Sequence, residues 1–293
     1  MRLALVSNAR SGSEDMADAV LEALRDAGAD VEPVGLETFC GGPDSIDDDR
    51  MADVAAGLRG LERVVVAGGD GSIGPAAALA ARAGVPLAVV PTGTANDFAR
   101  FLEIPLDVAE AARLAADPSA TIRSVELARA AGRRPFVNAA STGLSVLAAA
   151  NARPLKPRLG PLAYGVGALR AGLTGAARRM TVRCDGEVAF RGRTWQVVVA
   201  ATGAFGAGSA TGGVDPHDHR LDVAIVEAGP RIKLLRRAIA MKRRRLVEDP
   251  AVRHVRGRVV EIDGARTFNV DGEVLQVRPA RFAIDGSVQV VAP

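Results

Sequence analysis

The first third of the chain alternates short apolar runs with amphipathic segments. The apolar runs at residues 3–6, 64–67 and 85–90 are rich in valine and leucine, and each is typical of a buried strand. Between them, residues 16–27 and 76–83 carry apolar side chains at helical spacing. Such alternation is typical of an open, mostly parallel sheet with helices on both faces. We therefore predict an α/β domain at the N-terminus.

The pattern changes after about residue 117. Short strand-like runs then follow one another, and Asp-Gly pairs supply turns between them. The pairs are Asp185-Gly186, Asp263-Gly264, Asp271-Gly272 and Asp285-Gly286. Helical insertions at about residues 161–179 and 232–247 interrupt these strands. We predict a second, mainly antiparallel β-sandwich domain.

Length and composition fit two domains with a sizeable core. The chain has 293 residues, and 48% of them are hydrophobic. It lacks the uninterrupted run of about 18 apolar residues that a membrane span needs. Cys40 and Cys184 have no metal-like spacing, which favours free thiols and a cytoplasmic location. We place the α/β domain at residues 1–120 and the sandwich at 121–282, with the tail at about 283–293 allowed to return to the first domain.

Local charge is more informative than the formal net charge of +3. On a helical wheel, residues 231–246 form a basic amphipathic helix. Its basic face either contacts anionic lipid headgroups or stays in solvent on a helix docked to the sandwich. The glycine-rich, apolar stretch at 161–179 either lines an acyl-chain cleft or covers the core. The chain has 1 tryptophan and 1 tyrosine, too few for the aromatic stacking typical of single-stranded nucleic-acid binding, so we expect no nucleic-acid partner.

Glycine-rich turns follow two neighbouring predicted strands. They are Gly68-Gly69-Asp70-Gly71-Ser72 and Pro91-Thr92-Gly93-Thr94-Ala95-Asn96-Asp97. A third turn of small polar residues, 7–13, follows the first strand. Ligands of such sheets bind at the carboxyl ends of the strands, where backbone N–H groups and helix N-termini attract phosphate and carboxylates attract a cation. Three such loops can surround one triphosphate, although the P-loop and the dinucleotide-binding fingerprint are both absent.

On these residues the chain resembles the lipid kinases related to diacylglycerol kinase, which include bacterial diacylglycerol kinase and sphingosine kinase. The matching segments are residues 68–72, residues 91–99, the Asn-x-x-Ser-x-Gly segment Asn138 to Gly143, and Asp271-Gly272-Glu273. They occur in the family's order, and the resemblance covers essentially the whole chain. The segment 91–99 is the specific one, because NAD kinases and phosphofructokinases share the first glycine motif.

The resemblance implies transfer of a phosphoryl group from ATP to a lipid hydroxyl, with Mg²⁺, in a nucleotide cleft between the two domains. The residues it assigns to the nucleotide are Asn8, Ser11, Gly69, Gly71, Ser72 and Thr94. It assigns Asp70 and Asp97 to the phosphate-bound magnesium, directly or through water. It makes Asp271 the general base, with Glu273 beside it in the metal network. Without the resemblance, Asp271-Gly272 is one of four similar hairpin turns.

An aspartate-rich loop at 211–222 is similar to one that binds a structural magnesium in bacterial relatives. The resemblance assigns this metal to the carboxylates of Asp215 and Asp218 and to the backbone carbonyl of Arg220. Here His217 and His219 stand where the family has aspartate and glycine. A charged surface turn without metal is the alternative interpretation.

Three functions stay open at this point. The leading hypothesis is a peripheral lipid kinase that phosphorylates diacylglycerol or a related lipid, located in the cytoplasm at the inner face of the membrane. An NAD kinase-like or other small-molecule kinase shares the first glycine motif. A catalytically silent regulator that binds nucleotide or lipid is the third, motivated by the two histidines in the aspartate-rich loop. The acceptor lipid is open, and so is the oligomeric state, for which a homodimer is one alternative.

Overall fold

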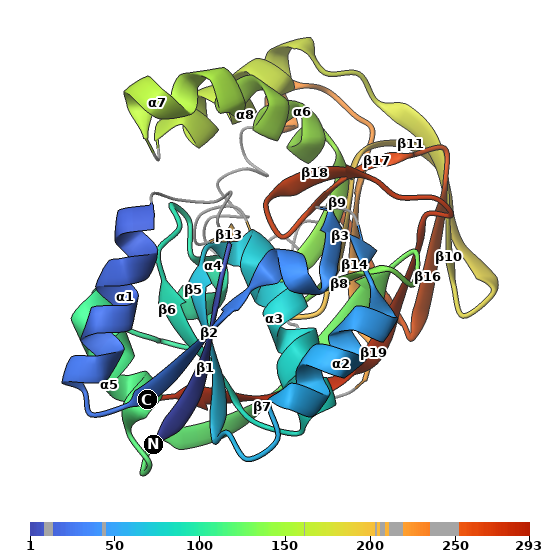
Figure 1. Cartoon of the computed structure of the whole chain (residues 1–293). Coiled ribbons are helices and arrows are strands. Elements are labelled where there is room, and N and C mark those ends of the chain that lie inside the picture. Colours follow the sequence, from blue (N-terminus) through green and yellow to red (C-terminus); the bar gives the residue numbers. More distant parts are fainter. Residues whose placement is uncertain are drawn as a thin grey trace. The chain divides into compact units, whose positions relative to one another are not determined.

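A computed structural model describes residues 1–8, 14–42, 45–160, 162–202, 204–205, 209–210, 219–234 and 252–293. The chain divides into two compact units, whose elements are labelled in Figure 1. Unit 1 consists of Met1–Leu127, Arg133–Val137 and Gly286–Pro293, and unit 2 of Ala128–Gly132 and Asn138–Asp285. Residues 121–127 and 133–137, which the predicted boundary assigns to the second domain, therefore pack with unit 1. The boundaries of the two folding domains stay a prediction.

Unit 1 is built on a parallel sheet. Its strands are β1 (Arg2–Ser7), β2 (Asp30–Gly35), β5 (Arg63–Gly68), β6 (Leu87–Pro91) and the C-terminal part of β19 (Arg281–Ala292). They lie in the order β19-β6-β5-β1-β2, with every pair parallel. The strands predicted from the apolar runs are confirmed, and so is the α/β class of the N-terminal part.

Helices cover both faces of this sheet. They are α1 (Glu14–Asp26), α2 (Asp48–Gly57), α3 (Asp70–Ala83), α4 (Asp97–Phe101) and α5 (Val108–Ala116). The remaining elements between residues 36 and 136 are the 3-10 turn η1 (Leu36–Thr38) and the strands β3 (Cys40–Gly42), β4 (Ser45–Ile46), β7 (Thr121–Ala130) and β8 (Arg134–Phe136). Figure 1 shows α1 and α5 on one face and α2 and α3 on the other.

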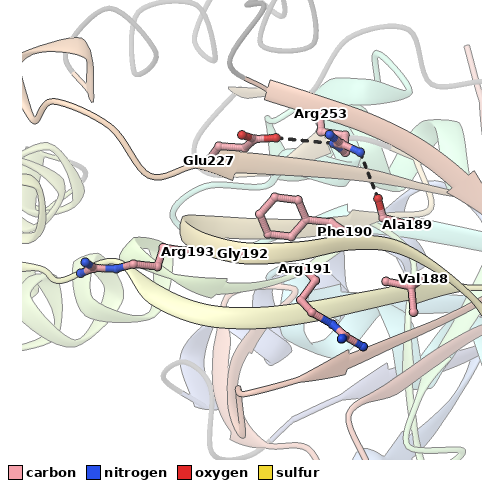
Figure 2. A pocket seen from close by; sticks show the side chains of 8 residues that line it. All are labelled: Val188, Ala189, Phe190, Arg191, Gly192, Arg193, Glu227 and Arg253. Atoms are coloured by element: carbon pink, nitrogen blue, oxygen red, sulfur yellow. Dashed lines mark hydrogen bonds and ion pairs between the residues drawn. The ribbon is translucent and has the colours of Figure 1, made fainter.

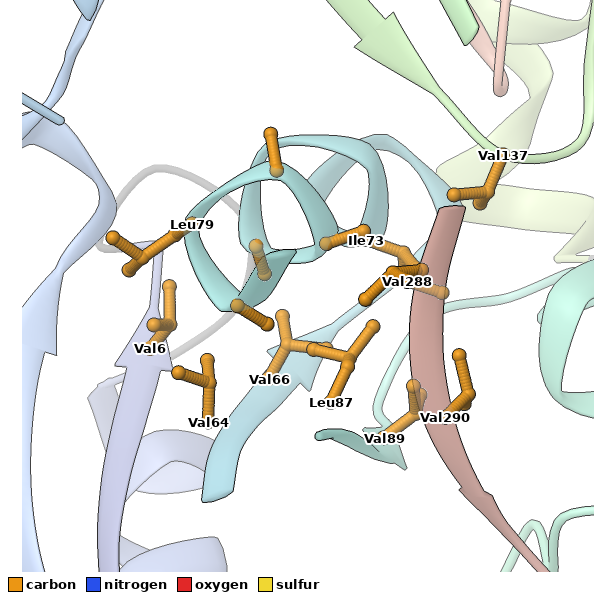
Figure 3. Packing of buried hydrophobic residues seen from close by; sticks show 14 of the residues in the cluster. Val6, Val64, Val66, Ile73, Leu79, Leu87, Val89, Val137, Val288 and Val290 are labelled. Atoms are coloured by element: carbon orange, nitrogen blue, oxygen red, sulfur yellow. The ribbon is translucent and has the colours of Figure 1, made fainter. Parts of the chain in front are cut away.

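Alternate residues of each strand enter two different cores. Val64 and Val66 pack with Ile73 and Leu79 of α3, as Figure 3 shows. Val65, between them, packs with the side chains of α1 and α5 instead. Because the side chains of a strand point alternately to its two faces, a strand covered on both faces reads as a continuous apolar run. This explains why residues 64–67 show no polar alternation.

Unit 2 contains an antiparallel sheet. Its strands are β9 (Ala139–Gly143), β10 (Arg178–Cys184), β11 (Glu187–Ala200), β14 (Leu221–Glu227), β15 (Val252–Gly257), β16 (Val259–Asp263), β17 (Thr267–Val270), β18 (Glu273–Gln276) and the first part of β19. A small hairpin joins β12 (Ala204–Phe205) to β13 (Ser209–Ala210). The long strand β11 pairs with β10 through its first half and with β9 and β14 through its second. These pairings are all antiparallel, as predicted.

Short helices follow β9 in unit 2. They are α6 (Leu144–Ala152), the 3-10 turn η2 (Arg153–Leu155), α7 (Lys156–Leu159) and α8 (Leu162–Thr174). The predicted insertion at 161–179 is thus α8 together with the start of β10. The second predicted insertion lies outside the described residues from residue 235 onward. Among the described helices, none has the length and apolar character required to cross a bilayer.

Arg63 fixes the end of helix α5 to the sheet. Its guanidinium donates to the carbonyl oxygens of Ala115 at 2.7 Å and Asp117 at 2.7 Å, and to that of Leu114 at 3.4 Å. The last carbonyls of a helix have no partner within the helix, so this side chain supplies one. The side chain is 5% exposed, and burial lowers the pKa of the guanidinium, an effect that Asp117 and Glu62 partly offset.

We expect Arg63→Met to lower the free energy of unfolding by about 2–3 kcal/mol, because it leaves buried carbonyl groups without a donor. Urea unfolding followed by circular dichroism measures the change. Arg59→Met is the matched control, since Arg59 is exposed at the end of α2 and its loss should cost less than about 0.5 kcal/mol. Equal effects of the two substitutions would contradict the capping role.

Candidate active site

The predicted phosphate loops leave the sheet of unit 1 at one edge. In the register of the parallel strands, Ser7 lies opposite Ala67, and Gly68 lies opposite Pro91. The carboxyl ends of β1, β5 and β6 are therefore aligned. Asn8, which follows β1 and is half-buried, starts the third loop at the same edge. Ser11, the other predicted nucleotide residue of that loop, lies outside the described residues.

The two glycine-rich turns touch each other through their backbones. A Cβ atom added to Gly93 would lie 2.5 Å from the Cα atom of Gly69, and one added to Gly69 would lie 3.2 Å from the Cα atom of Gly93. The Thr92 N–H also donates to the carbonyl oxygen of Gly68, at 3.1 Å. Only glycine allows so close an approach. The two turns therefore form one continuous backbone surface at the end of β5 and β6.

Asp70 joins the second turn through its side chain. Its Oδ2 atom accepts the Asp97 N–H at 3.2 Å, and its Oδ1 atom accepts the Phe98 N–H at 3.0 Å. These are N-terminal amides of α4, which lack partners within the helix. Asp70 thus caps α4 although it belongs to the first turn of α3. Each carboxylate oxygen has two acceptor positions, so this role leaves the chemistry of a metal ligand available to it.

Asn96 and Asp97 are buried at the start of α4, where each is 7% exposed. Asn96 adopts a left-handed backbone conformation, with φ of 49°, and its Nδ2 atom donates to the Gly93 carbonyl at 2.9 Å. The Oδ1 atom of Asn96 is buried without a hydrogen-bond partner. A buried amide oxygen without a partner is costly. It is therefore suited to a polar ligand or to a water molecule that a ligand orients.

The donor set of unit 1 suits a hard cation that is shared with phosphate. Carboxylate and amide oxygens are the ligands that Mg²⁺ prefers, and Mg²⁺ in such sites takes only one or two carboxylates together with phosphate oxygens and water. The described residues include no group of three or more His, Cys, Asp or Glu side chains that could hold a metal ion. The carboxylates of Asp70 and Asp97 have the chemistry of such ligands, and their contact with magnesium stays a prediction.

Arg134 is a buried residue of this part that the sequence motifs do not identify. It is 4% exposed, and its Nη2 atom donates to the Gly71 carbonyl at 2.6 Å. Its strand, β8, packs so closely on α3 that a Cβ atom on Gly74 would lie 2.4 Å from the Pro135 oxygen. Arg134 thus holds the first turn of α3 in place. The Arg133-Arg134 pair before Pro135 carries no motif that could reveal this role.

The other predicted nucleotide residues differ in their accessibility. Thr94 is exposed, and Gly69 and Gly71 are half-buried. Ser72 is 4% exposed, and a Cβ atom on Gly68 would lie 2.9 Å from its Oγ atom. Ser72 therefore packs against the end of β5, and its backbone N–H donates to the Gly69 carbonyl at 2.9 Å. The contact of these residues with a nucleotide stays a prediction.

The predicted base, Asp271, lies in unit 2 on the turn between β17 and β18. Asp271 and Gly272 both have positive φ, 45° and 89°, as in the tight turns that favour Asp-Gly. The Asp271 side chain is 6% exposed. Its Oδ1 atom accepts the N–H groups of Asn138 at 3.1 Å and Ala139 at 3.0 Å, and its own N–H donates to the Ala139 carbonyl at 3.1 Å. Glu273, the first residue of β18, is half-buried.

Burial distinguishes Asp271 from the other three Asp-Gly turns. Asp185, Asp263 and Asp285 are all exposed. The Asp185 carboxylate accepts the Val259 N–H at 2.9 Å, whereas Asp263 and Asp285 pair with arginines on neighbouring strands. A carboxylate withdrawn from water requires compensating donors, and the two backbone amides supply them to Asp271. Four identical dipeptides thus occupy two different environments.

The Asn-x-x-Ser-x-Gly segment lies directly beside Asp271. Besides its N–H bond to Asp271, Asn138 accepts the Thr202 hydroxyl at 3.3 Å through its Oδ1 atom. Ser141 pairs with Asn269 of β17. Gly143 has φ of 94°, and a Cβ atom there would lie 2.2 Å from the Trp195 oxygen. The segment therefore fixes the strand β9 against β17 and β11, and it holds the carboxylate of Asp271 through its first two amides.

The aspartate-rich loop is only partly described. Asp215, His217 and Asp218 lie outside the described residues. Arg220 is exposed, and His219 is exposed with φ of 56°, a conformation that favours glycine. A glycine is what the resemblance leads one to expect at that position. The structural magnesium site stays a prediction.

A shallow groove of about 400 Å³ lies on the sheet of unit 2, and none of the residues that line it is predicted to act in catalysis. Figure 2 shows Arg253 beside the ring of Phe190, with Glu227 next to it. The Arg253 guanidinium carbon is 5.8 Å from the ring centroid, and its Nε atom is 3.5 Å from the Glu227 carboxylate. Arg191 and Arg193 extend away from the ring in the same view. The groove has no convergent set of cations, and we assign it no ligand.

Comparison with protein families gives two matches that together span most of the chain. Residues 2–130 match the diacylglycerol kinase catalytic domain. Residues 138–292 match the YegS C-terminal domain, described as NAD kinase beta sandwich-like. The second match identifies the antiparallel part of the chain as the predicted β-sandwich.

Individual relatives agree with these matches. A protein of Pseudomonas fluorescens named probable lipid kinase YegS-like is 30% identical over 99% of this chain and 94% of its own length. A diacylglycerol kinase of Bacillus subtilis is 27% identical over 100% of this chain and 96% of its own length. The crystal structure of a diacylglycerol kinase from Bacillus anthracis superposes with a TM-score of 0.72 at 22% identity, covering 100% of this chain and 97% of that one, and shows the same fold. The chain therefore belongs to the lipid kinase family that joins a diacylglycerol kinase catalytic domain to a YegS-type C-terminal domain.

Proposed function

We propose that the protein transfers the γ-phosphoryl group of ATP, with Mg²⁺, to a hydroxyl of diacylglycerol or a closely related lipid. The observation that carries the proposal is the environment of Asp271. This chain belongs to the family, and the aspartate of its Asp-Gly-Glu segment is buried and held by two backbone amides. A carboxylate held in this way is a fixed proton acceptor, as a general base must be.

The residues of unit 1 supply the nucleotide half of the mechanism. The joined glycine turns lead into the N-terminus of α3, where backbone N–H groups and the helix dipole favour phosphate oxygens. The first amides of α4 are already bonded to Asp70. Asp70 and Asp97 would hold the magnesium ion. When bound, that ion would neutralise the charge of the phosphates in the transition state. Arg134 keeps the first turn of α3 in register through its bond to Gly71.

The residues of unit 2 supply the acceptor half. Asp271 takes the proton of the lipid hydroxyl as its oxygen attacks the γ-phosphorus, so that an O–P bond forms, the bond to the ADP oxygen breaks and the proton ends on the carboxylate. The amides of Asn138 and Ala139 keep Oδ1 in place throughout. Glu273 adds a second carboxylate two residues along the chain. Convergence of this half with the nucleotide half is part of the proposal.

The acceptor class and the location follow from the relatives' names and from local charge. The relatives are named lipid kinases or diacylglycerol kinases. Residues 231–246 are strongly basic, as expected of a contact with anionic headgroups at the inner face of the membrane. We therefore place the enzyme in the cytoplasm, in peripheral contact with the membrane.

Incubation with γ-labelled ATP and a panel of acceptors tests the proposal. With Mg²⁺ we expect label in diacylglycerol or a related lipid in mixed micelles, and at least a hundredfold less label when the metal is chelated, because the phosphate charge is then not neutralised. NAD without lipid is the comparison acceptor. Label in NAD alone would instead indicate a small-molecule kinase, and nucleotide binding without transfer to any acceptor would indicate a silent regulator.

Asp271→Asn tests the proposed base. We expect kcat to fall by about a thousandfold, within the range typical for loss of a general base, while the Kd for ATP changes less than about threefold. Asparagine keeps an oxygen that accepts the two amides, so the fold should remain. Asp263→Asn, at an exposed Asp-Gly turn, is the matched control and should keep normal kcat. Normal turnover of the Asp271 variant would remove Asp271 from its role.

Gly93→Ala tests the contact between the glycine turns. The added methyl group would meet Gly69 and the Oδ1 atom of Asn96, which lies 2.7 Å from the Cβ position, so the turns must separate. We expect the Kd for ATP to rise at least tenfold in calorimetric titration and the free energy of unfolding to fall by about 1–3 kcal/mol. Gly57→Ala is the control, because nothing lies within 4 Å of its Cβ position at the end of α2. Unchanged ATP binding by the Gly93 variant would contradict the shared phosphate surface.

A further inference from the structure

Helix α8 has its small residues inside and its large ones outside. The buried residues of the helix are Ala163, Gly167 and Ala171, spaced four apart on one face. A Cβ atom on Gly167 would lie 2.4 Å from the Ala148 oxygen of α6, so the two helices are in backbone contact. The elements with which α8 makes its main contacts are α6 and α7, which lie beside it in Figure 1. The inner face thus contributes close packing without large side chains.

The opposite face of α8 carries a stripe of aliphatic side chains. Leu162 is 72% exposed, Leu169 is 63% and Leu173 is 68%, with Val166 at 39% between them. At about 100° per residue, these four positions fall within roughly 60° of the helix circumference. Single exposed leucines are ordinary on protein surfaces, but a continuous exposed stripe marks an interaction surface.

The stripe holds most of the strongly exposed apolar side chains in the part of the chain that the structure describes. The four most exposed large ones are Leu162, Leu169, Leu173 and Ile232. Ile232 follows Arg231, which donates to the carbonyl oxygens of Gly172 at 3.1 Å and Leu173 at 2.5 Å. All four therefore belong to α8 or to the segment bonded to its end.

Arg231 also fixes the direction of the helix. Its guanidinium carbon lies 5.4 Å from the centroid of the Trp195 ring, while it bonds the last carbonyls of α8. A cation at the C-terminus of a helix satisfies carbonyls that lack partners and interacts favourably with the helix dipole. The apolar stripe is therefore presented by a helix anchored at its end.

The charged residues in the sequence around the stripe all have one sign. Residues 144–179 contain no aspartate or glutamate. The basic residues of the same stretch are Arg153, Lys156, Arg158, Arg170, Arg178 and Arg179. The five arginines are exposed. An aliphatic face on a stretch of chain whose charged residues are all basic complements a surface that is apolar beneath a layer of negative charge.

We propose that the outer face of α8 docks on a bilayer that contains anionic phospholipids, with the leucines at the boundary between headgroups and acyl chains and the arginines on the phosphates. Helices that lie in the bilayer interface have this combination of an aliphatic face and basic borders. The inference deepens the proposed function, since an enzyme that acts on a lipid acceptor must reach it in a bilayer. The biological role of the docking rests on the proposed function, whereas the docking itself is argued from α8 alone. The docking surface is the outer face of α8 in unit 2, to whose end Arg231 is bonded, and it does not depend on the basic residues from 233 onward.

Vesicle co-sedimentation tests the docking surface. We expect the wild-type protein to sediment with vesicles of phosphatidylcholine and phosphatidylglycerol, to sediment at least tenfold less with phosphatidylcholine alone, and to be released by high salt. Leu169→Gln/Leu173→Gln should lower the partition into anionic vesicles at least tenfold. Ile122→Gln/Val188→Gln is the matched control, because it changes two exposed aliphatic residues elsewhere and should bind as the wild type does. Arg170→Gln/Arg178→Gln should reduce the preference for anionic vesicles while keeping the fold.

The proposal would be overturned if the wild-type protein did not bind vesicles, or if the double-leucine variant bound them as well as the wild type does. It would also be overturned if the wild type were a dimer in sedimentation equilibrium and the double-leucine variant a monomer. A kinase assay on a short-chain, monomeric diacylglycerol separates the two proposals. Transfer to this acceptor without vesicle binding would remove the docking surface and keep the proposed function. Vesicle binding without transfer to any acceptor would remove the proposed function and keep the docking surface.

Discussion

The candidate nucleotide half depends on one steric constraint, the backbone contact between Gly69 and Gly93. With a Cβ position on Gly93 only 2.5 Å from the Gly69 Cα atom, no side chain fits at that position. The close approach is what brings the Asp70 carboxylate within reach of the first amides of α4. Both helix N-termini are then held at the edge where β5 and β6 end. A phosphate surface made of backbone groups needs this absence of side chains more than it needs any single polar residue.

The two carboxylates with the central predicted roles are held by the same device. Asp70 accepts the amides of two consecutive residues at the start of α4, and Asp271 accepts the amides of the consecutive residues Asn138 and Ala139. A pair of neighbouring N–H groups fixes an anion in direction as well as in distance, because both donors belong to one rigid stretch of backbone. Groups that act on a phosphoryl transfer need such fixed positions, since positioning and charge stabilisation supply most of the rate.

The sequence predicts the strands of unit 1 well because each is covered on both faces and therefore reads as a continuous apolar run. It also indicates the glycine turns, since several glycines directly after a strand are typical of a tight connection or of backbone that approaches another group closely. It does not reveal that Asp70 caps a helix from another element, because the bond joins residues 27 positions apart. Nor does it separate Asp271 from Asp263, because the dipeptide is the same and only tertiary burial differs. Resemblance to a family supplied that distinction.

Helix α8 is a second case in which the sequence predicts the element but not its burial. Its apolar spacing predicts a helix but leaves open which face is covered, and the ordinary expectation is that leucines lie inside. Burying a leucine is worth roughly 1.5–3 kcal/mol, so a helix that exposes Leu162, Leu169 and Leu173 while burying Ala163 and Gly167 forgoes several kcal/mol of stability within the isolated chain. A second surface that covers the leucines would recover this energy. The charged residues of 144–179 are all basic, which favours an anionic surface, so an anionic bilayer fits the stripe better than a neutral protein face does.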